Sequence, residues 1–159
     1  MRLPVLGPDA PPVWARLATP HAGTDHGFVF RPEVADEVVV GFTNCDPRCP
    51  IVLGGVFSSA NPPPEPVAEA TEENLEKGIV TRSGTRIVIS DADDPSITIE
   101  TPSGSKLRLD DDQEVLEIVD SHGNTMVMSS DGIALTSAAD VVIEASGDVR
   151  ITGASIDMS

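Results

Sequence analysis

The stretch that decides the fold occurs three times, as Ser83-Gly84-Thr85-Arg86-Ile87-Val88-Ile89, as Ser103-Gly104-Ser105-Lys106-Leu107-Arg108-Leu109 and as His122-Gly123-Asn124-Thr125-Met126-Val127-Met128. Each copy has a glycine, two polar residues and then an apolar-x-apolar triplet. Residues two apart in a strand point to the same face of a sheet. Each triplet therefore predicts a short strand that places two aliphatic side chains on one side.

Further triplets lie between and after these copies and bring the number of units to nine, at spacings of 10, 10, 9, 10, 7, 8, 8 and 7 residues. A short recurring period is typical of a solenoid or a stack of strands rather than of a globular core. The residues between the apolar positions are mostly small or polar and are expected to face solvent. The predicted inward residues are Ile87, Ile89, Ile97, Ile99, Leu107, Leu109, Leu116, Ile118, Met126, Met128, Ile133, Leu135, Val141, Ile143, Val149 and Ile151.

The number of inward residues bears on the oligomeric state. A flat monomeric sheet with this pattern would expose one apolar face and two open edges. One chain cannot close such strands around an axis with only two inward residues per strand, whereas three chains wound together can form a three-faced prism. Residues 78–159 therefore predict an intertwined homotrimeric triple-stranded β-helix, roughly 40 Å long at ~4.8 Å per strand. The alternative, a two-sheet sandwich, normally uses larger core residues.

Composition divides the chain into two unlike segments. All five aromatic residues and twelve of the fourteen prolines lie before residue 67, and positions 78–159 hold fifteen acidic and five basic side chains, a net charge of −10. The whole chain of 159 residues carries −16, which disfavours nucleic acid and anionic lipid as partners. The longest apolar runs are far shorter than the roughly 20 residues of a membrane-spanning helix.

The first segment predicts short strands at residues 13–18, 37–42 and 51–57, where β-branched and aromatic residues lie between Gly, Pro and Asp clusters. Residues 44–48 have turn chemistry. We therefore expect a small antiparallel barrel or sandwich over residues 1–57. Residues 58–77 form a Pro-rich linker, in which residues 69–77 fit either a short helix or an extended spacer.

An ordered series of motifs points to a known family. In the first segment the motifs are residues 14–20, 26–42, 46–48, 50–56 and 61–64, including Trp14-Ala15-Arg16-Leu17-Ala18-Thr19-Pro20; residues 81–84 and 97–104 follow. In this order they resemble the OB-fold domain of VgrG-like spike proteins and the β-helix that follows it. Such spikes occur in contractile phage tails, type VI secretion systems and extracellular injection particles. The resemblance covers nearly the whole chain.

The resemblance implies a mechanical, non-enzymatic role as the central spike that sheath contraction drives through a target cell envelope. It implies a homotrimer that meets hub, tube and baseplate proteins at its N-terminal end. A conical PAAR-repeat tip protein, often with effector cargo, would bind the C-terminal residues Ile156, Asp157, Met158 and Ser159. The family's hub domain is not in this sequence, and the first barrel strand is expected to be truncated. No signal-peptide pattern follows Met1, so we expect assembly in the cytoplasm and release as part of the particle.

Candidate residues for chemistry are few. His21, His26 and His122 are the only histidines, and none stands in a nucleophile motif with Ser or Cys. His122 is a weak candidate for an axial metal shared by three chains, against the alternative of a turn residue beside Gly123. Cys45 and Cys49 form a Cys-x3-Cys pair, a weak zinc pattern for which a local disulfide or reduced thiols are the alternatives. No catalytic residue and no cofactor is predicted.

The alternative function is a trimeric β-helical adhesin that binds a surface glycan. Such a protein would present exposed aromatic platforms for stacking against sugars, and the sequence from position 78 to 159 contains no aromatic side chain. An enzyme is the third possibility, which hydrolysis of envelope material would support.

Overall fold

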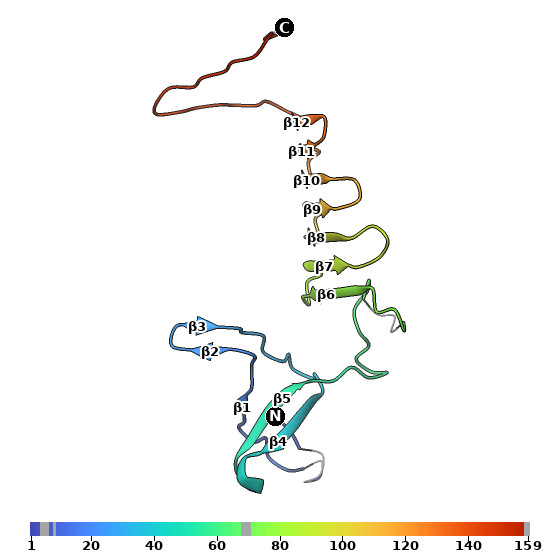
Figure 1. The fold of residues 1–159 in the computed structure, drawn as a ribbon. Coiled ribbons are helices and arrows are strands. Elements are labelled where there is room, and N and C mark those ends of the chain that lie inside the picture. Colours follow the sequence, from blue (N-terminus) through green and yellow to red (C-terminus); the bar gives the residue numbers. More distant parts are fainter. Residues whose placement is uncertain (4–6, 8, 68–70, 158–159) are drawn as a thin grey trace. The chain divides into compact units, whose positions relative to one another are not determined.

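The computed structural model describes residues 1–3, 7, 9–67 and 71–157. The chain divides into two compact units, Met1–Glu69 and Ala70–Ser159. Apart from a 3₁₀ turn at Thr43–Cys45, the regular structure of the described residues consists of β-strands (Figure 1). The expectation of an all-β protein is thus confirmed. In the described residues, no helix has the length and apolar content that crossing a membrane requires.

The first unit contains a three-stranded sheet and a small ribbon. In the sheet, β5 (Pro50–Gly55) lies between β4 (Val38–Phe42) and β1 (Arg16–Leu17). The β4–β5 pair is antiparallel, as the sequence predicted. Strand β1 runs parallel to β5, which differs from the antiparallel arrangement that we expected for the whole segment. The ribbon pairs β2 (Ala22–Gly23) with β3 (His26–Gly27).

The core of the first unit is thin. Val52 and Pro50, both on the central strand, are the only buried residues in the described part of the chain. The β4–β5 connection is held mainly by its own backbone, where the Thr43 amide donates to the Cys49 carbonyl at 3.0 Å and the Cys49 amide donates to the Asp46 carbonyl at 2.9 Å. These contacts fix the β4–β5 hairpin without a large apolar interior.

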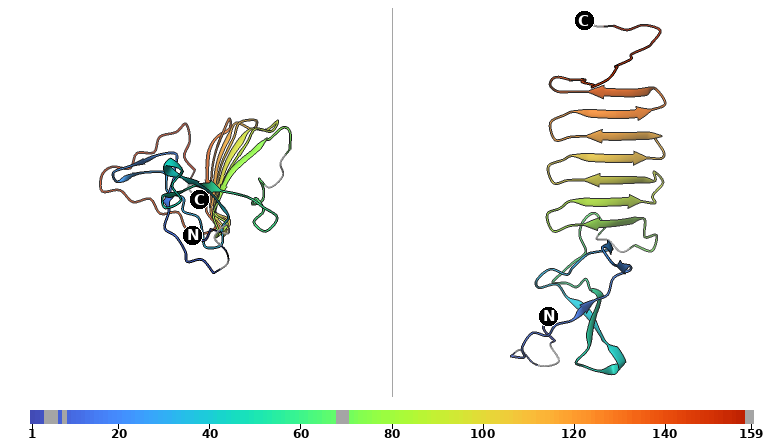
Figure 2. Two further views of the ribbon diagram at one scale, coloured as in Figure 1. Left: turned by 90° about the horizontal axis from the view of Figure 1, so that it is seen from below. Right: turned by 90° about the vertical axis from the view of Figure 1, so that its left-hand side faces the viewer.

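The second unit is a single sheet of seven five-residue strands, each hydrogen-bonded to its neighbours in sequence (Figure 2). All six pairings are antiparallel. In chain order, the strands are β6 (Glu76–Val80), β7 (Arg86–Ser90), β8 (Ser96–Glu100), β9 (Lys106–Asp110), β10 (Val115–Val119), β11 (Thr125–Ser129) and β12 (Gly132–Thr136).

The glycine of each recurring motif ends a turn on the same side of this sheet. Gly84, Gly104 and Gly123 have φ of +89°, +89° and +91°, a backbone region that favours glycine. In the first turn, the Gly84 amide donates to the Thr81 carbonyl at 2.9 Å, and the turns containing Gly104 and Gly123 repeat this bond. The spacing of these glycines therefore follows from the alternation of strands and turns.

The strands match the sequence pattern in part. Six of the nine predicted units, from Ile87 to Leu135, coincide with β7 to β12. The next two units, at residues 141–143 and 149–151, have no strand, and the last unit ends in residues outside the described part. Residues 76–80 form strand β6, so the short-helix alternative for residues 69–77 is wrong.

The pairing also differs from the intertwined arrangement expected for residues 78–159. From β6 to β12, each strand is hydrogen-bonded to the next strand of its own chain. A five-residue strand followed by a short turn repeats about every ten residues, which suits a hairpin within one chain. One chain therefore supplies a complete sheet over these residues.

Candidate functional site

Two rows of side chains cross the seven-stranded sheet on one face. The second row begins at Lys77 in β6, and all the other members of both rows are aliphatic. We call the thirteen apolar members the aliphatic face. Across the strands, the first row reads Ile79, Ile87, Ile99, Leu107, Ile118, Met126 and Leu135, and the second continues from Lys77 as Ile89, Ile97, Leu109, Leu116, Met128 and Ile133.

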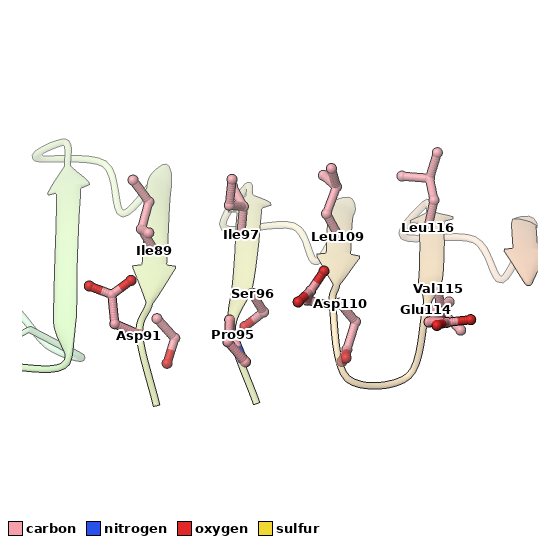
Figure 3. A pocket seen from close by; sticks show the side chains of 12 residues that line it. Ile89, Asp91, Pro95, Ser96, Ile97, Leu109, Asp110, Glu114, Val115 and Leu116 are labelled. Atoms are coloured by element: carbon pink, nitrogen blue, oxygen red, sulfur yellow. The ribbon is translucent and has the colours of Figure 1, made fainter. Parts of the chain in front are cut away.

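The aliphatic face is not covered by a second layer of the described residues. Ile97 and Leu109 keep 39% and 44% of their surface exposed, and Ile133 keeps 70%. Figure 3 shows Ile89, Ile97, Leu109 and Leu116 projecting side by side from four consecutive strands. A contiguous apolar face of this extent exceeds what soluble monomers ordinarily expose, and it marks an interaction surface.

The predicted inward residues divide into two groups. The twelve residues from Ile87 to Leu135 are brought together on the aliphatic face. Val141, Ile143, Val149 and Ile151 are not: each is more than half exposed on a segment without strands. Ile156 and Asp157, predicted to meet a tip protein, are also exposed. Met158 and Ser159 lie outside the described residues.

A hollow of about 550 Å³ lies at one edge of the aliphatic face. Its apolar floor includes Ile97 and Leu109, and its rim includes Asp91 and Asp110 (Figure 3). The amide of Gln113 donates to Asp110 Oδ1 at 2.9 Å and Arg108 Nη2 donates to Oδ2 at 2.6 Å. These two contacts, the backbone one first, hold the pKa of Asp110 below its ordinary value. Asp110 therefore stays ionised at neutral pH.

The opposite face of the sheet carries charged side chains together with small apolar residues such as Val88 and Val127. Arg86 Nη2 and Glu100 Oε2 are 2.5 Å apart across β7 and β8, and Lys106 Nζ and Glu117 Oε2 are 2.7 Å apart across β9 and β10. Because these side chains are partly exposed, each pair is worth only about 0–1 kcal/mol. These ion pairs show that this face of the sheet can remain in contact with solvent. Apart from Lys77, the charged side chains of the strands therefore lie on the face opposite the aliphatic residues.

Lys77 is the residue of the two rows that sequence reasoning missed. Its register partner is Ile89, which places it on the side of the aliphatic residues, and its ammonium group pairs with Asp91. A lysine in a triplet does not match an apolar-x-apolar pattern, so the pattern does not predict β6. The available signal was Ile79, eight residues before Ile87. The ion pair sets a polar boundary at the β6 end of the aliphatic face.

The remaining candidates do not form a catalytic or metal constellation. His122 lies in the exposed turn between β10 and β11, where its amide donates to Asp120 Oδ1 at 2.8 Å. Cys45 and Cys49 are exposed free thiols near the β4–β5 connection. Among the described residues, no group of three or more His, Cys, Asp or Glu side chains could hold a metal ion.

Comparison with known proteins assigns the first unit to a class. Residues 1–57 match the family profile of the type VI secretion system/phage-baseplate injector OB domain. The three-stranded sheet and the ribbon lie within these residues. Within the first unit, residues 1–57 are therefore similar to an injector OB domain.

Three relatives narrow the class. The actin cross-linking toxin VgrG1 of Vibrio cholerae is 38% identical over 56 residues, which are 35% of this chain and 5% of that protein. The type VI secretion system spike protein VgrG4b of Pseudomonas aeruginosa is 40% identical over 58 residues, 36% of this chain and 7% of the relative. For the spike protein VgrG3 of Vibrio cholerae the values are 39% over 51 residues, 32% and 5%.

The similarity to VgrG proteins, which the sequence motifs predicted, thus covers about a third of the chain, and two of the three relatives are type VI secretion system spike proteins. The matches span 5–7% of the length of these relatives. The matching family profile ends at Phe57, before β6 begins. The family match therefore gives no information on the role of the second unit, and evidence for that role comes from the structure of the unit.

Proposed function

We propose that the chain forms the non-enzymatic central spike of a contractile injection machine. Three copies pack their aliphatic faces together into a needle, and sheath contraction drives that needle through the target envelope. The observation that carries this proposal is the uncovered aliphatic face in a chain that also holds an injector OB domain. Burial of apolar surface supplies about 25 cal/mol per Å², so the face favours contact with another apolar surface, and a second copy of the chain offers one.

The dimensions of the sheet favour three copies. A five-residue strand is about 17 Å long. If three sheets of that width met as a triangular prism, the axis would lie about 5 Å from each sheet, half the ~10 Å spacing of packed sheets. Aliphatic side chains fill that distance, whereas aromatic rings would not. A face-to-face pair of sheets would also cover the aliphatic residues but would leave the sides of both sheets open.

The segment after β12 fits the same needle. Its apolar triplets at residues 141–143 and 149–151 find no partner strand within one chain. In the trimer, the neighbouring chains supply those partners, so this section is wound rather than folded into hairpins. The needle therefore has a lower part with one sheet per chain and an upper part shared among chains.

The remaining parts of the proposal follow from the resemblance to VgrG-like spikes. The OB domain end meets hub and baseplate proteins, and a PAAR-repeat tip protein with its effector covers the C-terminal end. The particle assembles in the cytoplasm of the producing cell and is then released or delivered outside it. The chain itself needs no catalytic residue for this role, because the sheath does the work.

Substitution on the two faces of one strand tests the trimer. Ile99→Asp would place three unpaired carboxylates near the axis, which costs several kcal/mol, and should abolish assembly. The matched control is Thr98→Asp on the opposite face of β8, which should still assemble. The measurement is the sedimentation mass, expected at three times the chain mass of 16.6 kDa.

Two results would contradict the trimer. The first is a wild-type chain that sediments as a monodisperse monomer or as a dimer, at one or two times the chain mass. The second is equal loss of assembly in both variants, because a face-independent effect would not identify the aliphatic face as the contact.

A further inference from the structure

Two histidines lie together on the β2–β3 ribbon of the OB domain. His26 is in β3 opposite Gly23, and His21 immediately precedes β2. The imidazole centroids are 5.1 Å apart and the ring planes are inclined at 48°. The two rings therefore meet as a diagonal cross-strand pair.

Gly23 makes this approach possible. The His26 ring lies over the position that a Cβ of residue 23 would occupy, so any other residue there would push the ring away. The absence of a side chain at Gly23 therefore keeps the His26 ring folded across the ribbon, toward His21.

The hydrogen bond of His26 selects its tautomer. Its Nδ1 lies 2.7 Å from the Thr24 carbonyl oxygen. A carbonyl oxygen only accepts, so Nδ1 carries the proton and Nε2 keeps its lone pair free. Histidines that bind metals commonly have this arrangement, in which a backbone carbonyl orients the ring and fixes the ligating nitrogen.

The ring separation matches that of a chelating pair. Zinc–nitrogen bonds are about 2.0–2.1 Å long, which puts each ring centroid about 3.2 Å from the metal. At a tetrahedral angle, two such centroids are about 5.2 Å apart. The observed centroid separation of 5.1 Å is close to this value.

We propose that His21 and His26 form a two-imidazole site for a divalent transition-metal ion, with Zn²⁺ as the representative ion. Imidazole nitrogen suits zinc, copper and nickel and does not suit calcium or magnesium. No third residue of the described part completes a cluster, so water fills the other positions. The bound ion links two strands of two residues each and so stabilises the ribbon.

Calorimetric titration of the full-length, untagged chain with ZnCl₂ tests this site. We expect one Zn²⁺ per chain, and at least tenfold weaker binding in both His21→Gln and His26→Gln. Gly23→Ala should weaken binding as well, because it displaces the His26 ring without removing a ligand. The matched control is His122→Gln, which removes the third histidine and should bind as the wild type does.

A second measurement separates the site from the acidic surface. Cu²⁺ electron paramagnetic resonance should report two nitrogen ligands in the wild type and one or none in each single variant. Equal Zn²⁺ binding in the wild type and in the His21→Gln/His26→Gln double variant would assign the metal to carboxylates and overturn the proposal. So would a wild type that binds no Zn²⁺ at submillimolar concentration.

Discussion

In the turns that contain the recurring glycines, the first residue bonds through its side chain to the backbone of the turn, and this residue is either threonine or aspartate. At the first and second turns, Thr81 Oγ1 and Thr101 Oγ1 donate to the carbonyls of Thr85 and Ser105 at 3.1 and 3.3 Å. At the third turn, Asp120 takes the place of the threonine. Its carboxylate accepts bonds from the Asn124 side chain and amide and from the His122 amide.

The third turn should therefore respond to pH where the other two do not. The Asn124 side chain, then the backbone amides, lower the pKa of Asp120 below its ordinary value of about 3.9. A lowered folded-state pKa stabilises the fold above the unfolded-state pKa, and this stability is lost as pH falls through the folded-state pKa. We expect Asp120→Thr to flatten the decrease in melting temperature between about pH 5 and pH 2.

The reciprocal variant provides the control. Thr101→Asp introduces a carboxylate at the equivalent place of the second turn and should steepen the same acid dependence. Melting temperature followed by circular dichroism across this range would decide the matter. Parallel pH profiles for the wild type and Asp120→Thr would contradict the assignment.

At the scale of elements, the glycine turns make a prediction about strand connection. Gly104 has φ of +89°, and a Cβ built there would meet no atom within 4 Å. Gly104→Ala should therefore cost only the backbone penalty of the left-handed region, about 1–2 kcal/mol per chain. Urea unfolding would measure it. The control is Gly147→Ala: a Cβ at this position also meets no atom within 4 Å, and its φ is not left-handed, so stability should change little. An equal loss of stability in both variants would contradict the assignment of the loss to the left-handed backbone of Gly104.

The apolar pattern of the sequence predicted some of the strands of the second unit but not all of them. The triplets from Ile87 to Leu135 follow one another at the spacing of strands in a hairpin, and apolar residues alternate with other residues within each triplet. Each of these triplets forms a strand. Strand β6 escapes the pattern because Lys77 stands at an apolar position, and its pairing with Asp91 is a contact between two separate parts of the chain. The triplets after Thr136 have the same local pattern but no strand, because pairing depends on a partner as well as on pattern.

The candidate site was predictable to a similar extent. Period and alternation identified twelve residues of the aliphatic face, since both are local properties of the chain. They could not show that His21 and His26 meet, because that depends on a turn and on the space left by Gly23. The same local pattern could not decide between hairpins of one chain and strands wound among three.

At the scale of the whole molecule, the two units should unfold separately. The first unit has a core of its own around Val52. In the trimer proposed above, the sheet of the second unit would depend on partner chains. Calorimetry should show two transitions. Only the transition of the second unit should rise in temperature with protein concentration, because association stabilises it by mass action. A single transition independent of concentration would argue against an assembled needle.

The direction of the hydrogen bonds in the seven-stranded sheet has a mechanical consequence. The bonds point along the stacking direction of the strands, so a force along that direction acts on them lengthwise. Compression pushes the strands against one another, where their van der Waals contacts resist. Tension would open the bonds one pair at a time from the end, as a zipper opens. Such a sheet is stiff when pushed and weak when pulled, so a rod built from it could enter a barrier under load yet come apart if withdrawn by its tip.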